Sequence, residues 1–476
     1  MSEELESGTK LKQLAELALR QAEYFKDAEK KVYAQVKIGG HSEFYPVKAY
    51  EFENWLSAIN YKAFDEVPTN KLKSEVVQYI EGVQRIASPE VEVGLRVRGD
   101  DSFIEIDLGG HEWKSVYLND LGWEVDLHKN YFYRGRASAS LPIPVTGDDE
   151  QDWLVRFFKL SDNQAKLVQG WLLGCFKPQG PYPILILQGE QGSGKSTLAS
   201  FLRSLVDPSL AEKTSLPNSE RDLYIHALNN YVLTFDNQRT IYSKKSDWLC
   251  RMSTGGGFST RRLYTNTEDE FFNCTRPMIL NGITHLADEP DLLDRALVIN
   301  LPGIDGRKTE KELKHKFEEL KPRIFGQLCD LLVSVLGQED KHLDDLPRMA
   351  DFAMFVSKAE SDLGWQEGSF IKAMKENRKE ALEILHESDS FLNALIQLAE
   401  TRKELSWIFL GTPTDLYQEL LDNTPNKAWK NQLPNSPASL SKRLEMLKPV
   451  LREKGIRVTN SKSRGKRLKR IEWMKT

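Results

Sequence analysis

The segment that most constrains the fold is a glycine-rich loop between an apolar run and an amphipathic helix pattern. Residues 189–196 read Gly-Glu-Gln-Gly-Ser-Gly-Lys-Ser and fit the pattern G-x-x-x-x-G-K-S/T. The run YPILILQ precedes this loop, and STLASFLRSLV follows from its last residue onward. In this order, strand, loop and helix present backbone amides and the positive end of a helix to a phosphate group. The sequence therefore predicts an α/β domain with a phosphate-binding loop.

The loop and the start of its helix supply candidate ligands for a nucleoside triphosphate and for magnesium. Lys195 can reach the β- and γ-phosphates, and the Ser196 hydroxyl can bind Mg²⁺. The cofactors that this motif implies are therefore ATP and Mg²⁺. The residues that we expect to bind the nucleotide are Gly189, Gln191, Gly192, Ser193, Gly194, Lys195, Ser196 and Thr197.

A second apolar run, YVLTF, leads into Asp236 and Asn237. Asp236 stands where an aspartate can hold the magnesium ion, directly or through water. Common ATPases place a glutamate after this aspartate to activate water, but this chain has Asn237. An amide cannot accept a proton at neutral pH, yet it can orient a water molecule. Orientation counts for more than base strength in a loose phosphoryl-transfer transition state, so we hypothesise that Asn237 positions the attacking water.

Apolar runs and turn signals divide the chain into regions. Four near-continuous apolar runs, ILILQ, YVLTF, MILNG and ALVINL, alternate with helix patterns, which is typical of a parallel sheet covered on both faces. Upstream, helical spacing gives way to alternation, which predicts a small antiparallel unit. The predicted organisation is a helical region at 1–90, a β-rich unit at 91–150, a phosphate-loop core at 151–305, a helical connector at 306–386 and a C-terminal domain at 387–476.

Composition restricts the class of protein. No apolar run approaches the ~20 residues that span a bilayer, and the N-terminus lacks the apolar core of a signal peptide. We therefore expect a cytoplasmic protein with no membrane partner. The four cysteines form no Cys-x-x-Cys pair, which argues against a disulfide framework and against a structural zinc site.

The net charge of −5 combines an acidic body with a basic tail. From Leu421 to Thr476 there are 15 Lys and Arg residues against 4 Asp and Glu residues, a local charge of +11. Such a tail predicts contact with a polyanion, most simply nucleic acid, whereas a solvated basic face is the alternative.

The basic tail also has a pattern of helices and strands. An apolar stripe at helical spacing, capped by Ser439 and ended by Gly455, comprises Leu440, Leu444, Leu447 and Leu451. A strand, a basic turn and a last strand follow, and TPTDLYQELLDN supplies a helix upstream. Helix, helix and basic hairpin predict a winged-helix domain. Domains of this kind bind DNA or protein, and the local charge favours DNA.

In a winged-helix domain, the basic residues would have distinct positions on duplex DNA. The second helix would enter a major groove with Lys442 and Arg443 near its N-terminus. The wing would contact phosphates through Arg464, Lys466 and Arg467.

Several segments together resemble AAA+ ATPases of phages, plasmids and integrative elements, which are grouped with superfamily 3 helicases and poxvirus primase–helicase ATPases. The similar segments are GPYPILILQGEQGSGKST, SDWLCRMSTGGGFSTRRLYTN, RPMILNGI, DLLDRALVINLPGI and PRMADFA. The resemblance implies a homo-hexameric ring that binds ATP between subunits and pulls single-stranded DNA through its centre. Duplex DNA would meet the C-terminal domain.

The resemblance also implies roles for two residues of the core. Asn281, at the end of the run MILN, would contact the attacking water or the γ-phosphate. Arg295 would reach the nucleotide of the neighbouring subunit and stabilise charge in the transition state. A salt bridge from Arg295 to Asp291 or Asp294 is the alternative.

A DNA-binding hairpin is implied in the segment TGGGFSTRRLYTNTEDE. Its glycines permit a tight turn, and Arg261, Arg262 and Tyr264 offer cationic and stacking groups for a sequence-tolerant grip on a single strand. One of these arginines could instead contact nucleotide across the subunit interface, or the segment could be a plain surface hairpin.

These observations support a main hypothesis and two alternatives. The main hypothesis is an ATP-dependent DNA helicase or translocase that serves replication of a mobile genetic element. The second is an ATP-switched AAA+ regulator of defence or transposition that binds DNA and turns over slowly, for which Asn237 is the best support. The third is a signalling ATPase whose basic tail binds protein.

Overall fold

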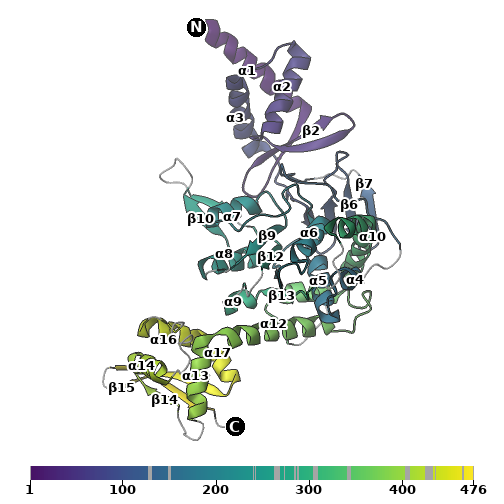
Figure 1. The fold of residues 1–476 in the computed structure, drawn as a ribbon. Helices are drawn as coiled ribbons and strands as arrows, with labels where there is room; N and C mark the ends of the chain where they lie inside the picture. Colours follow the sequence, from purple (N-terminus) through teal and green to yellow (C-terminus); the bar gives the residue numbers. More distant parts are fainter. Residues whose placement is uncertain are drawn as a thin grey trace. The chain divides into compact units, whose positions relative to one another are not determined.

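Figure 1 shows the computed structural model, in which the chain divides into two compact units, Met1–Arg378 and Lys379–Thr476. The boundary between the units falls within helix α12 (Ser369–Ser388). The residues that the structure describes are 2–126, 131–147, 152–239, 241, 243–261, 269–272, 274–282, 286, 289–303, 309–339, 345–402, 408–423, 433–434, 436–463 and 466–474.

The N-terminal part of the first unit combines three helices with a three-stranded antiparallel sheet. Its elements are α1 (Ser2–Gln21), β1 (Ala22–Lys26), β2 (Val32–Ile38), β3 (His41–Pro46), α2 (Tyr50–Phe64) and α3 (Asn70–Ala87). The prediction of a helical region is therefore wrong for the three strands. Strand β2 buries consecutive residues, so it lacks the alternation of a half-buried strand. The pair Gly39-Gly40, in which Gly39 has a φ of +62°, was the available hairpin signal.

The small antiparallel β-unit that alternation predicted is confirmed. Its strands are β4 (Val97–Gly99), β5 (Ile104–Asp107), β6 (Ser115–Asn119) and β7 (Gly122–Asp126), in the order β4-β5-β6-β7. Strand β5 is buried along its whole length, and the apolar residues of the unit share one core with the helices that follow. The β-unit is therefore an integral part of the first unit.

A four-stranded parallel sheet forms the centre of the phosphate-loop region, as the four apolar runs predicted. Its strands are β8 (Ile184–Gln188), β9 (Leu233–Gln238), β12 (Met278–Gly282) and β13 (Ala296–Asn300). Their order is β13-β8-β12-β9, and all three pairs are parallel. One face of the sheet packs against α5 (Asp162–Gly174), α6 (Lys195–Val206) and α10 (Glu310–Gly337) through Leu185, Leu187, Ile279, Leu297 and Ile299.

Shorter elements surround this sheet. They are α4 (Trp153–Phe158), α7 (Glu220–Ala227), α8 (Ser243–Thr254), β10 (Phe258–Arg261), β11 (Asp269–Phe272), α9 (Pro290–Leu293) and α11 (Ala350–Ser357). Helices α10, α11 and α12 form the helical region expected after the sheet. Among the described residues, no helix has the length and apolar character that crossing a membrane requires.

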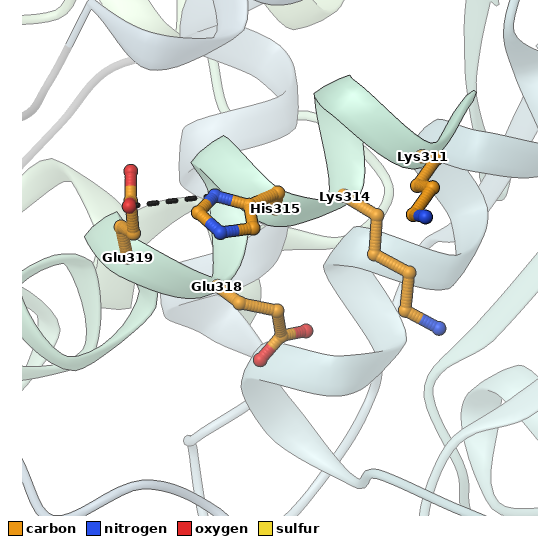
Figure 2. Close-up of a pocket in the computed structure, with 5 residues that line it drawn as sticks. All are labelled: Lys311, Lys314, His315, Glu318 and Glu319. Atoms are coloured by element: carbon orange, nitrogen blue, oxygen red, sulfur yellow. Dashed lines mark ion pairs between the residues drawn. The ribbon is translucent and has the colours of Figure 1, made fainter. Parts of the chain in front are cut away.

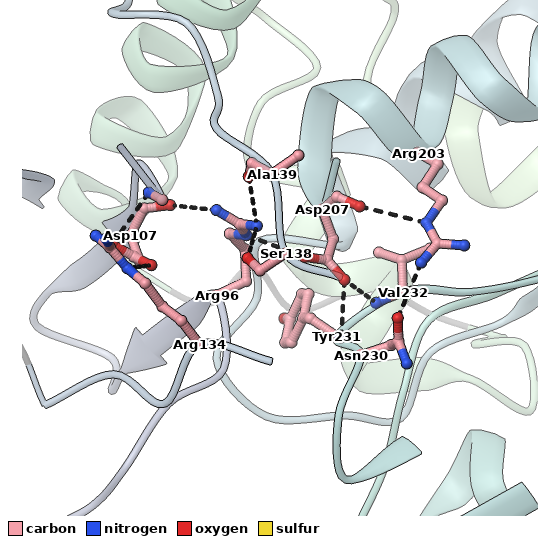
Figure 3. A network of polar contacts seen from close by, with 11 residues as sticks. Arg96, Asp107, Arg134, Ser138, Ala139, Arg203, Asp207, Asn230, Tyr231 and Val232 are labelled. Atoms are coloured by element: carbon pink, nitrogen blue, oxygen red, sulfur yellow. Dashed lines mark hydrogen bonds and ion pairs between the residues drawn. The ribbon is translucent and has the colours of Figure 1, made fainter. Parts of the chain in front are cut away.

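A buried polar network centred on Arg96 joins the β-unit to the phosphate-loop helix (Figure 3). The Arg96 side chain is fully buried and donates to Asp207 Oδ1 at 3.0 Å and to groups of Asp107, Ser138 and Ala139. Asp207 is the C-cap of α6, and its Oδ2 accepts the backbone N–H groups of Tyr231 and Val232. One carboxylate therefore connects the β-unit, the end of α6 and the segment that leads into β9.

Replacing Asp207 by alanine should lower the free energy of unfolding by about 3 kcal/mol, because Arg96 would keep a buried charge without its partner. Denaturant unfolding followed by tryptophan fluorescence measures this change. Glu16→Ala is the matched control, since Glu16 pairs with Arg20 at 3.8 Å on an exposed helix surface and such pairs contribute about 0.5 kcal/mol or less. Equal unfolding midpoints for the two variants would contradict the importance of the network.

The second unit packs helices against a three-stranded antiparallel sheet. Its elements are α13 (Ser390–Thr401), β14 (Phe409–Gly411), α14 (Pro413–Asn423), α16 (Pro437–Met446), α17 (Lys448–Glu453), β15 (Ile456–Ser463) and β16 (Lys466–Trp473). The sheet order is β14-β16-β15, and a hydrophobic core of its own joins the sheet to the helices. The predicted sequence of helices and a basic hairpin is observed, with the short strand β14 in addition.

The predicted single helix from Ser439 to Gly455 is wrong, because the structure has two helices there. Ser436 is the N-cap of α16, and its hydroxyl accepts the N–H of Ser439 at 3.2 Å. Pro449 has no amide hydrogen to continue the helix, so α17 begins separately at Lys448. Gly455, with a φ of +78°, follows the end of α17.

Candidate functional site

The topology of the parallel sheet brings five predicted site residues to one edge. The carboxyl ends of parallel strands lie at the same edge of a sheet, where open α/β sheets bind ligands. The phosphate loop follows β8, and Asp236 and Asn237 lie near the end of β9. Asn281 lies near the end of β12, which is the strand between β8 and β9. The residues gathered at this edge are Lys195, Ser196, Asp236, Asn237 and Asn281.

The phosphate loop has the backbone conformation that its glycines predict. Gly189, Gly192 and Gly194 have φ values of +147°, +84° and +84°, in the region that favours glycine. Lys195 is the first residue of α6, and its Nζ donates to two loop carbonyls at 2.8 and 2.6 Å. Burial lowers the pKa of Lys195, and the charge of Asp236 acts in the opposite direction.

Ser196 and Asp236 form the candidate magnesium site. The Ser196 hydroxyl donates to Asp236 Oδ1 at 3.0 Å, and the Asp236 backbone N–H donates to the carbonyl of Thr214 at 2.9 Å. A hydroxyl and a carboxylate are oxygen ligands, and Mg²⁺ commonly takes one or two protein carboxylates together with water and phosphate oxygens. These residues therefore fit a magnesium ion bound with a nucleotide.

Asn237 and Asn281 contact each other through the backbone of Asn237. The Asn237 N–H donates to Asn281 Oδ1 at 2.7 Å and to Asp236 Oδ1 at 3.0 Å, while the Asn237 side chain is exposed. Asn281 is only 2% exposed, and its Nδ2 has no hydrogen-bond partner in the described part of the chain. A buried donor without a partner costs about 1–3 kcal/mol. Asn281 is therefore suited to donate to a bound phosphate or water.

Arg295 lies at the opposite edge of the same sheet. It directly precedes β13, and its carbonyl accepts the N–H of Ile184, the first residue of β8, at 2.8 Å. The length of β8 separates that position from the phosphate loop, a distance of about 17 Å at 3.3 Å per residue. Arg295 is therefore too distant to serve the phosphate site of its own chain.

Within its own chain, Arg295 forms a salt bridge with Asp291, which the sequence analysis gave as the alternative to a catalytic role. Its Nη1 lies 2.5 Å from Asp291 Oδ2 and donates to the Asp291 carbonyl at 2.8 Å. Asp294 pairs instead with Arg348 and Arg378. Burial disfavours the charged form of Asp291, but hydrogen bonds and charges from Arg295 and Arg348 lower its pKa overall. Arg295 thus belongs to a cluster of two aspartates and three arginines.

The predicted hairpin is present as the antiparallel pair β10–β11. Its base is fixed by the Tyr224 hydroxyl, which donates to the carbonyl of Gly256 at 2.6 Å. Arg262 and Tyr264 lie outside the described residues, as does the side chain of Arg261. Their contact with DNA therefore stays a prediction.

The two basic residues predicted on the second helix of the tail differ in their contacts. Lys442 is exposed on α16. Arg443 donates to Asp389 Oδ2 at 2.8 Å, and Asp389, whose side chain is 7% exposed, is the N-cap of α13. This ion pair gives Arg443 a role in packing α16 against α13, so Lys442 is the better candidate for contact with DNA.

The wing carries a cationic pair, of which the sequence analysis predicted Arg467 and missed Lys462. Arg467 on β16 lies directly opposite Lys462 on β15, and both are exposed. Like charges in this arrangement destabilise a strand pair, and a bound anion would relieve the repulsion. The segment SKSRGKR contained the signal, because Ser463 lies opposite Lys466 and its second residue therefore lies opposite its last. Arg464 and the side chain of Lys466 lie outside the described residues.

A shallow hollow of about 460 Å³ on α10 is distinct from these sites (Figure 2). Its lining residues all come from successive turns of that helix and are exposed: Lys311, Lys314, His315, Glu318 and Glu319. His315 Nδ1 lies 3.4 Å from Glu319 Oε1. Ligand pockets are mostly apolar concave sites with few polar groups, so this charged helix surface does not compete with the phosphate loop as the functional site.

Comparison with known protein families assigns the chain to a class. Residues 151–378 match the family model described as actinomycete integrative conjugative element replication protein, and residues 391–476 match the model described as AICE RepA C-terminal domain. The two matches together cover about two thirds of the chain. The chain is therefore a member of a replication-protein family of mobile genetic elements. The family that both models describe is that of the replication proteins of actinomycete integrative conjugative elements.

Solved structures give weaker similarities. The A form apo structure of the NrS-1 C-terminal region matches with a TM-score of 0.44 and 15% identity, over 97% of this chain and 98% of that chain. The apo structure of NrS-1 residues 305–718 matches with a TM-score of 0.40 and 14% identity, over 97% and 98% of the two chains. No curated protein matches the chain. The predicted link to replication of a mobile element is thus confirmed by the family models, and DNA is the partner that replication implies.

Proposed function

We propose that this protein is an ATP-dependent DNA helicase or translocase with an AAA+ core. The observation that carries the proposal is the cluster of polar residues at the carboxyl edge of the parallel sheet. In this proposal, Lys195 binds the β- and γ-phosphates, while Ser196 and Asp236 hold Mg²⁺. The metal would neutralise phosphate charge, and Asn281 would donate to the γ-phosphate or the attacking water.

Assembly of subunits would complete this site. Because Arg295 is about one strand length from its own phosphate loop, it would act on the nucleotide of a neighbour in a ring that we propose to be a homo-hexamer. The γ-phosphate would then replace Asp291 as the partner of Arg295. Arg348, which pairs with Asp291 at 2.8 Å, would keep that carboxylate neutralised. Hydrolysis would therefore depend on assembly.

DNA binding would involve both units. The hairpin β10–β11 would contact single-stranded DNA in the ring, through Arg261, Arg262 and Tyr264. Among its described residues, the second unit has the element order helix, strand, three helices and hairpin, with the first strand beside the last, which supports a winged-helix domain. Lys442 on α16 and the cationic pair of the wing would contact duplex DNA.

Replacing Lys462 and Arg467 together by alanine should weaken duplex binding uniformly across sequences. Each lost phosphate contact reduces the magnitude of the negative slope of log K against log salt by about 0.9, so this magnitude should fall by about 2. Fluorescence anisotropy at several salt concentrations measures it. The matched control removes Lys372 and Lys379, two cations that already pair with glutamates on α12. An unchanged slope in the variant that lacks Lys462 and Arg467 would show that these residues of the wing do not contact DNA phosphates.

Strand displacement on forked DNA tests the function as a whole. We expect ATP turnover that DNA stimulates and that is coupled to unwinding. Slow turnover by assembled rings that DNA leaves unchanged would contradict the helicase assignment.

A second function, an ATP-switched DNA-binding regulator, is favoured by one observation. Asn237 occupies the position after the magnesium aspartate, so no carboxylate follows Asp236 to serve as a base. Such a protein would bind ATP, change its DNA affinity and hydrolyse slowly. DNA affinity that differs between ATP-bound and ADP-bound protein, without unwinding, would support this function over the first.

A further inference from the structure

The strand pair β9–β12 contains a β-bulge at the candidate site. Leu280 lies opposite Phe235, whereas Gly282 lies opposite Gln238, and the register shifts between them. Two residues of β9 therefore share the single residue Asn281 as their partner. Bulges change the direction of side chains and are frequent next to active sites.

The two strands have the residue types that this bulge requires. Asn237, one of the two bulge residues on β9, has a left-handed backbone with a φ of +53°. Residues other than glycine rarely adopt this conformation, and asparagine tolerates it better than most. On the facing strand, a Cβ at Gly282 would lie 2.3 Å from the carbonyl oxygen of Gln238. The close approach of the strands therefore needs glycine at that position.

The bulge determines the orientation of the Asn281 amide. The Asn237 N–H lies 2.7 Å from Asn281 Oδ1. A backbone N–H can only donate, so the atom that faces it must be the carbonyl oxygen of that side chain. The amide nitrogen of Asn281 is then the buried group without a partner in the described residues. The backbone of Asn237 thus leaves a hydrogen-bond donor available at the edge of the sheet where the phosphate loop lies.

We propose that Asn237 is a positioning residue that acts through its backbone. Its left-handed conformation holds the Asn281 amide with Nδ2 available to the γ-phosphate or the attacking water. This inference rests on the proposed ATPase function. It replaces the hypothesis that the side chain of Asn237 positions the water, because the contact to Asn281 uses only the main chain and the side chain is exposed.

Asn237→Gly and Asn237→Ala form a matched pair that separates the two roles. Both substitutions remove the amide side chain, but glycine adopts the left-handed conformation readily and alanine does not. We expect the glycine variant to keep kcat within about twofold of the unaltered protein and the alanine variant to lose about tenfold. Nucleotide affinity, measured with a fluorescent ATP analogue, should be unchanged in both, which also shows that both are folded.

A second pair of variants tests whether the effect passes through Asn281. In proteins that also carry Asn281→Ala, the Asn237→Gly and Asn237→Ala variants should hydrolyse ATP at the same single-turnover rate, because the amide that the bulge orients is gone. A persisting tenfold difference would overturn the inference. Equal losses for glycine and alanine in the otherwise unaltered protein would overturn it in favour of the side chain, and full activity in both would overturn any positioning role.

The failure of this inference is distinguishable from failure of the proposed function. An unaltered protein that hydrolyses no ATP, with or without forked DNA, would refute the proposed ATPase and the inference with it. An active unaltered protein with one of the contrary patterns above would refute the inference alone.

Discussion

Replacement of Lys195 by alanine is expected to lower ATP turnover about a thousandfold or more, because a full positive charge at the transferred phosphate is lost. Among the described residues, the hydrogen-bond partners of Lys195 are two backbone carbonyls and the Ser193 hydroxyl, all neutral. Its charge is therefore available to a triphosphate. Steady-state turnover, with and without forked DNA, measures the effect.

The control for this variant is Lys311→Ala, which removes an exposed lysine from α10 and should leave turnover unchanged. The melting temperature of the Lys195 variant should stay close to that of the unaltered protein, because Lys195 forms no ion pair among the described residues. If Lys195→Ala hydrolysed ATP at the rate of the unaltered protein, the assignment of the phosphate loop as an ATPase site would be refuted.

Arg295→Ala should lower turnover of the assembled protein about a thousandfold, the scale on which an arginine supplied by a neighbour acts in phosphoryl transfer. Nucleotide affinity should change little, because the contact would form mainly with charge that develops in the transition state. Parallel measurements of kcat and of ATP-analogue binding separate the two effects. Arg378→Ala, in the same charged cluster, is the matched control and should keep most of the activity.

Mixing two inactive variants tests whether Arg295 acts between subunits. A Lys195→Ala subunit has an intact Arg295, and an Arg295→Ala subunit has an intact phosphate loop. In a randomly mixed ring of equal amounts, about a quarter of the head-to-tail interfaces combine both intact parts. Turnover should therefore recover above that of either variant alone. No recovery in rings shown to be mixed would exclude a role for Arg295 in the neighbouring site.

The phosphate loop and the parallel sheet could be predicted because local sequence determines them. The glycine positions of the loop have the left-handed conformations that its pattern requires, and every strand of the sheet begins in a near-continuous apolar run. The N-terminal sheet was missed because β2 is buried on both faces and so lacks a period of two. Its hairpin signal, Gly39-Gly40, is only two residues long.

Other features depend on residues distant in sequence, which no local pattern reveals. Arg443 looked like a free cation, but its partner Asp389 lies 54 residues upstream. The bulge at Asn237 depends on the register between β9 and β12, which are separated by α8 and a hairpin. Arg295 is distant from its own phosphate loop because it precedes β13, whereas the loop follows β8, which runs parallel to β13. The positions of the motifs in the sequence do not give the directions of the strands.

The carboxylate of Asp207 has a consequence for how such proteins can be recombined. The matched family segment begins at residue 151, yet Asp207 is paired with Arg96 and linked through it to Ser138 and Ala139, all of which precede that residue. A crossover at residues 140–150 with a relative that lacks either residue of this pair would leave the other as a buried charge without its partner. We expect selection to act against such chimaeras, so that the β-unit and the phosphate-loop core are inherited as a single block.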